Sequence, residues 1–104
     1  MSIARTIVVL VGAALLEVGG DALIRRGLHE RPGLLVGGAL SLVAYGVLVN
    51  QGGLEFGRLL GVYIAVFFVI SQAIGLAVFG DSLTWQIWLG GALIVSGGIV
   101  LLLA

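Results

Sequence analysis

Residues 3–24 read IARTIVVLVGAALLEVGGDALI, an apolar stretch long enough to cross a bilayer, which takes about 20 residues. Glu17 lies inside this stretch, and Asp21 follows one helical turn later. A carboxylate at membrane depth is costly, so it rarely persists without a partner, a water-filled cavity or a function. The stretch therefore predicts a membrane helix that carries a proton or cation site centred on Glu17.

The composition supports a membrane location for the whole chain. Of the 104 residues, 61% are hydrophobic and only 10% are charged, whereas soluble domains carry about 25% charged residues. The net charge is zero and there is neither a lysine nor a basic run, which argues against nucleic acid as a partner. There is no cysteine, and His29 stands alone, so we expect neither a metal nor a cofactor.

Three more apolar segments follow, at residues 33–49, 59–79 and 83–103. The connections between segments are short, which makes neighbouring helices antiparallel. The sequence thus predicts an all-α membrane protein, a compact up-down-up-down bundle of four transmembrane helices in a single domain, 1–104. We interpret the first segment as a retained helix, because its apolar run exceeds the 7–15 residues of a signal peptide.

The ends of the four helices have recognisable signals. Arg25-Arg26-Gly27 is expected to end the first helix, which would leave His29 in a loop. Residues 50–58 are expected to connect the second and third helices, with Glu55 and Arg58 solvated. Gly80 is expected to end the third helix. Asp81 or Ser82 is expected to cap the fourth.

The arginines are nearly balanced between the two ends of this bundle. One end would carry Arg25, Arg26 and Arg31, and the other Arg5 and Arg58. Orientation in a membrane follows such charge differences, so a balanced chain is predicted to insert both ways. Four short helices are too few to enclose a pathway, and many transporters consist of two inverted halves. We therefore expect an antiparallel homodimer; the alternative is one orientation, set by the three-arginine end.

The first segment carries a face of small and polar residues, interrupted by Leu10. Its members are Thr6, Ala13, Ala14, Glu17, Gly20 and Asp21. Desolvation favours the protonated carboxyl, which suits reversible proton binding at Glu17, and a cation would compete for the ionised form. The alternative is a neutral carboxyl that only bridges two helices. Asp21 could face the same cavity or form a shallow surface pair with Arg25.

The other segments offer partners for this face. Ser41 and Tyr45 of the second segment are candidate wall residues. Tyr63 of the third could donate a hydrogen bond to Glu17, or it could be an interfacial belt tyrosine. Gly90 and Gly97 lie two turns apart on one face of the fourth segment and predict a close helix–helix seam between two copies. Trp85 and Trp88 are assigned to the interfacial belt.

In order and spacing, these motifs resemble the small multidrug resistance family of the drug/metabolite transporter superfamily. Residues 17–25 match the family pattern Glu-Val-x-Gly-x-x-Leu-x-Lys/Arg, and Tyr63 matches an aromatic position. Phe79-Gly80, Gly90 and Gly97 match the last hairpin and dimer seam. Residues 66–70 lack the family's tryptophan and glycine pair. Gly57-Arg58 followed by Tyr63 also resembles an uncharacterised branch of small membrane proteins with the same architecture.

The resemblance implies a homodimeric, proton-coupled antiporter in a bacterial-type inner membrane. It would export small cationic or amphipathic compounds, with the two copies of Glu17 binding protons or substrate in alternation. The expected partners are a second copy of the chain, small cations, protons and membrane lipid. The alternatives are a lipid-carrier flippase subunit of the same superfamily and a non-transporting structural membrane protein. No nucleophile–base pair or phosphate loop is present, so we do not expect an enzyme.

Overall fold

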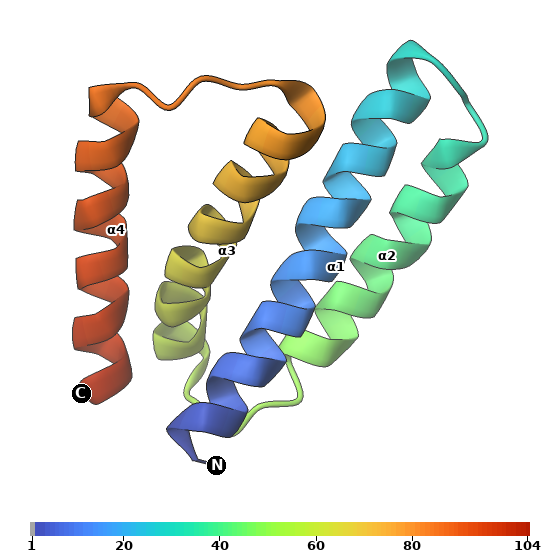
Figure 1. Cartoon of the computed structure of the whole chain (residues 1–104). Coiled ribbons are helices and arrows are strands. Elements are labelled where there is room, and N and C mark those ends of the chain that lie inside the picture. The colour runs from blue at the N-terminus through green and yellow to red at the C-terminus, as the bar shows by residue number, and fades with distance from the viewer. Residues whose placement is uncertain (1) are drawn as a thin grey trace.

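The structure is a computed structural model that describes residues 2–104 and contains four α-helices. They are α1 (Ile3–His29), α2 (Leu34–Val49), α3 (Phe56–Phe79) and α4 (Trp85–Leu103). Successive helices run in opposite directions, so both termini lie at one end and the α1–α2 and α3–α4 connections lie at the other (Figure 1). The predicted four-helix membrane fold is confirmed.

Three of the helices, α1, α3 and α4, are long and apolar enough to cross a membrane. The fourth, α2, has 16 residues, fewer than the roughly 20 that a perpendicular span needs. A short span is accommodated by local thinning of the bilayer or by polar flanking groups at its ends. These lengths and the composition identify an integral, multi-pass membrane protein.

The helices are arranged in the spatial order α2, α1, α3, α4, rather than closing into a ring (Figure 1). The extents of 43 × 34 × 19 Å describe a flattened body. Its core lies where α1 meets α3, with Leu10, Ala13 and Ala14 of α1 against Leu59 and Val62 of α3. The expected compact bundle is thus an open one, because α4 packs mainly on α3.

The predicted helix ends need correction at several places. Gly27 does not end α1; it lies inside the helix, because the chain continues in helical conformation as far as His29. His29 is therefore a helical residue rather than a loop residue. At the next connection, α3 begins at Phe56, three residues earlier than predicted. Tyr63 consequently lies about two turns inside its helix.

Arg58 was predicted to be solvated, and this was wrong. It lies in the first turn of α3, half-buried, and donates hydrogen bonds of 2.8 Å from Nε to the Leu101 carbonyl and from Nη2 to the Leu102 carbonyl. The last carbonyls of a helix have no partner within that helix, and a cation near them also interacts well with the helix dipole. Arg58 therefore links the end of α4 to the start of α3 through these hydrogen bonds.

In the α3–α4 connection, the end of α3 agrees with the prediction, whereas the start of α4 does not. Gly80 ends α3 with φ 68°, a left-handed conformation that glycine adopts without a steric penalty, as predicted. The next residue, Asp81, donates its backbone N–H to the Gly75 carbonyl at 3.0 Å. The residue before α4 is Thr84, not Asp81 or Ser82, because the chain stays non-helical until Trp85.

Candidate functional site

The candidate site lies where α1, α2 and α3 meet, at the level of Glu17. The Tyr63 hydroxyl donates a hydrogen bond of 2.9 Å to Glu17 Oε1. The Tyr63 side chain is only 4% exposed, whereas Glu17 is half-buried. A belt tyrosine would place its hydroxyl at the membrane surface, so burial and this bond favour the cavity interpretation of Tyr63.

Aromatic rings form the wall around this carboxylate. The Tyr45 ring, from α2, stacks on the Tyr63 ring with 5.4 Å between centroids and 28° between planes. The Phe67 ring lies one turn along α3, with its centroid 6.1 Å from that of Tyr63. Such pairs stabilise a fixed ring arrangement by about 0.5–1.5 kcal/mol beyond the area they bury. Aromatic faces beside a carboxylate form an environment that attracts organic cations.

Asp21 lines a separate polar cavity next to this site, which we call the vestibule. The cavity has a volume of about 260 Å³ and lies between α1, α3 and the loop after α3. Its lining includes Asp21, Arg25, Ser71 and Asp81, together with Phe67, which also borders Glu17's partner Tyr63. Asp21 is exposed in the single chain and lines the same cavity as Arg25, but among residues 2–104 no ion pair joins these two side chains.

The remaining predicted residues lie in different surroundings. Ser41 is half-buried one turn before Tyr45 on α2, and among residues 2–104 it has no hydrogen bond to Glu17. Gly20 was expected to share the face of Glu17, yet it packs against the Gly38 carbonyl of α2 instead. Gly90 and Gly97 lie on the face of α4 that has open space within 4 Å. They are available to a second copy.

Sequence reasoning missed two contributors to this region. Phe67 had a usable signal, because it lies four residues after Tyr63 and therefore on the same helical face. Asp81 had no signal in the sequence, because only the conformation of the α3–α4 loop brings it to the vestibule. Its carboxylate occupies the space that a side chain at position 75 would need, so Gly75 is what admits it.

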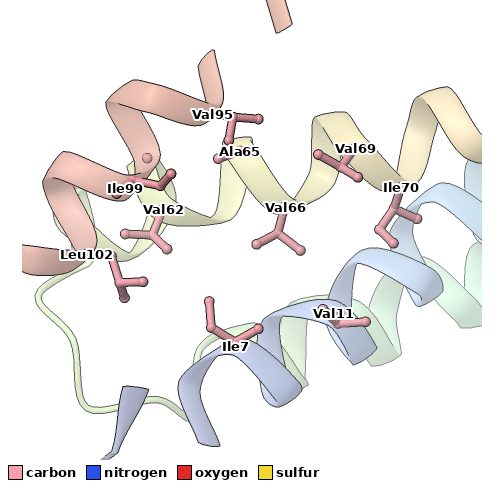
Figure 2. A pocket seen from close by; sticks show the side chains of 11 residues that line it. Ile7, Val11, Val62, Ala65, Val66, Val69, Ile70, Val95, Ile99 and Leu102 are labelled. Atoms are coloured by element: carbon pink, nitrogen blue, oxygen red, sulfur yellow. The ribbon is translucent and has the colours of Figure 1, made fainter. Parts of the chain in front are cut away.

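A second cavity, on the other side of the α1–α3 contact, is apolar rather than polar. Figure 2 shows aliphatic side chains from α1, α3 and α4 pointing into a shared space. The volume of this cavity is about 260 Å³. Ile7 and Val11 line it from α1, and Val66 and Val69 line it from α3. Nothing in this lining could bind a charged group, so it is suited to lipid tails or to apolar side chains.

The fold and the site define a class: small, multi-pass membrane proteins with a hydrogen-bonded carboxylate inside a span. Within this class, the chain belongs to the family described as "Uncharacterised BCR, YnfA/UPF0060 family", whose match covers residues 3–104. This family, rather than the small multidrug resistance family that the motifs resemble, is the one that the chain and its relatives match.

Several bacterial relatives are similar to this chain, two of them over nearly its whole length. A UPF0060 membrane protein of Streptomyces coelicolor is 35% identical, with 99% of this chain and 94% of the relative covered. The UPF0060 membrane protein YfjF of Bacillus subtilis is 34% identical over 95% of this chain and 94% of the relative. A Rhodococcus erythropolis relative is 41% identical over 64% of this chain and 65% of its own length. No solved structure matches the chain.

Proposed function

We propose that this protein is a proton-coupled antiporter that exports small cationic or amphipathic compounds. The observation that carries the proposal is the 2.9 Å hydrogen bond from Tyr63 to Glu17 inside the membrane spans. Among residues 2–104, no cationic side chain pairs with Glu17. A membrane carboxylate whose partner is a neutral donor can hold either a proton or a cation. Exchange of the two ligands at one site is the simplest form of coupled antiport.

The open arrangement of helices supports a dimer as the functional unit. Glu17 is half-buried and Asp21 is exposed in the single chain, yet both lie in a helix long enough to span the membrane. Contact with lipid would be costly for these groups, so a second copy is expected to cover them. The balanced arginines favour opposite insertion of the two copies in a bacterial-type inner membrane.

The test compares Glu17→Gln with Glu55→Gln. The first substitution removes the charge inside the span, and the second makes the same change at an exposed residue just before α3. Purified protein in detergent is mixed with tetraethylammonium, guanidinium or spermidine while released protons are measured. We expect release from the wild type and Glu55→Gln, and only background from Glu17→Gln. Wild-type release from a folded Glu17→Gln would refute the proposal.

The aliphatic cavity of Figure 2 favours one alternative, a lipid-carrier flippase subunit. A lipid tail could occupy that cavity without using Glu17. This alternative predicts that no tested cation releases protons and that Glu17→Gln remains fully functional in lipid translocation.

A further inference from the structure

The end of α3 is held against the end of α1 by an arginine–aromatic cluster. Phe79 is the last residue of α3, and its ring centroid lies 5.3 Å from the Arg25 guanidinium carbon and 5.7 Å from that of Arg26. Arg26 Nη2 also lies 3.5 Å from the Val78 carbonyl oxygen. Cations at these distances from a ring are attracted to its face, so the cluster connects the two helices at this end.

The cluster also separates two cavities. On one side is the vestibule, which Arg25 and Phe79 line together with Asp21 and Ser71. On the other side is an outer cavity of about 220 Å³, lined by the same two residues together with Arg26, His29 and Glu30. Since Arg25 and Phe79 belong to both linings, their side chains form the wall between the cavities.

Both cavities are polar enough to hold water. The vestibule contains two carboxylates, Asp21 and Asp81, and reaches Phe67 beside the Glu17 site. The outer cavity carries an imidazole and a carboxylate at the end of α1. Polar groups therefore line the cavity on each side of the wall. The wall itself consists of the side chains of Arg25 and Phe79, which can rotate. Arg25 and Arg26 are both exposed.

We propose that Arg25, Arg26 and Phe79 form a gate at this end of the protein. When Phe79 leaves the arginines, the outer cavity joins the vestibule, and water and small cations reach Glu17 from that side. The inference rests on the proposed function for what passes through the gate. In two copies inserted in opposite directions, each membrane face would have one such gate.

The gate can be tested without measuring transport, because the chain contains no cysteine. Ser71→Cys places a single thiol in the vestibule, and a neutral methanethiosulfonate reagent, whose approach does not depend on the arginine charges, reports its accessibility in nanodiscs. We expect Phe79→Ala to raise the labelling rate about five- to thirtyfold, the change that follows from losing two exposed cation–π contacts. Phe56→Ala, at the opposite end of α3 and 69% exposed, is the matched control and should leave the rate unchanged.

A second variant removes the cations instead of the ring. Arg25→Gln combined with Arg26→Gln should accelerate labelling to a similar extent, and adding Phe79→Ala should then contribute little more. Equal rates with and without the gate substitutions, or the same acceleration in Phe56→Ala, would overturn the gate. Accelerated labelling together with a fully coupled Glu17→Gln would uphold the gate and refute the proposed coupling role of Glu17.

Discussion

The helix α1 packs against α2 and α3 in two different ways. Towards α2 the backbones are in direct contact: a Cβ atom at Gly38 would lie 2.8 Å from the Gly20 carbonyl oxygen and 3.1 Å from the Ile24 amide nitrogen. A Cβ at Gly27 would lie 2.9 Å from the Leu35 amide nitrogen. Small residues that admit backbone contact are the usual basis of tight helix association in membranes.

Towards α3 the contact is looser and chemically mixed. A small apolar core around Leu10 is followed by the Tyr63–Glu17 hydrogen bond and, at the far end, by the arginines on Phe79. Cavities lie on both sides of this seam. From this difference in packing we expect α1 and α2 to move as one body and the protein to open at the seam with α3. The candidate site lies at that looser seam.

The largest expected effect comes from breaking the tight seam. Gly38→Ala must push α1 and α2 apart, since the new methyl group meets backbone atoms that cannot rotate away. We expect a loss of about 1–3 kcal/mol in stability, as for other overpacked contacts. Gly37→Ala is the matched control, because its nearest neighbour, Leu23 Cδ1, would be 3.7 Å away. Thermal unfolding in detergent distinguishes them; equal melting temperatures would mean that the seam is not tight.

We also expect α4 to form a tight seam, in this case with α4 of a second copy of the chain. Gly91 and Gly98 already pack on Phe68 and Ala65 of α3, whereas Gly90 and Gly97 have open space. Gly97→Leu should therefore weaken the dimer by about 1–3 kcal/mol without unfolding the chain. Gly46→Leu, at a glycine of α2 with equal space, is the control. Cross-linking in mild detergent measures the dimer fraction, and an unchanged fraction would place the interface elsewhere.

The last prediction concerns the looser seam between α1 and α3, and its effect is confined to the Glu17 site. Tyr63→Phe keeps the ring but removes the donor to Glu17, which destabilises the charged carboxylate relative to the protonated one. Cation binding needs the charged form, so the pH midpoint of cation binding should rise by about one to two units, given about 1.5–3 kcal/mol for such a bond and 1.36 kcal/mol per unit.

The control for this change is Tyr45→Phe, whose hydroxyl has no hydrogen bond to Glu17 within residues 2–104. It should leave the midpoint in place. If Tyr63→Phe also left it unchanged, the hydrogen bond would not stabilise the carboxylate that binds cations.

The sequence by itself determined the membrane location and the four helices, and it singled out Glu17 as the candidate site residue. Hydrophobic length and composition are properties of each segment alone, and a carboxylate within such a segment is conspicuous for the same reason. The end of α3 at Gly80 was predictable as well, because a left-handed residue after a helix strongly favours glycine. The first residues of α3 and α4 were not predictable, because neither helix begins with a side-chain capping hydrogen bond that the sequence could reveal.

Only the tertiary structure decided which faces meet. Gly20 and Glu17 are close on α1, yet one packs on Gly38 of α2 and the other accepts a hydrogen bond from Tyr63 of α3. Helical periodicity groups residues on a face, but the direction of that face depends on neighbouring helices. Arg58 on the carbonyls of α4 and Arg25 on Phe79 join residues far apart in the chain. Such contacts arise from packing, which no local pattern encodes.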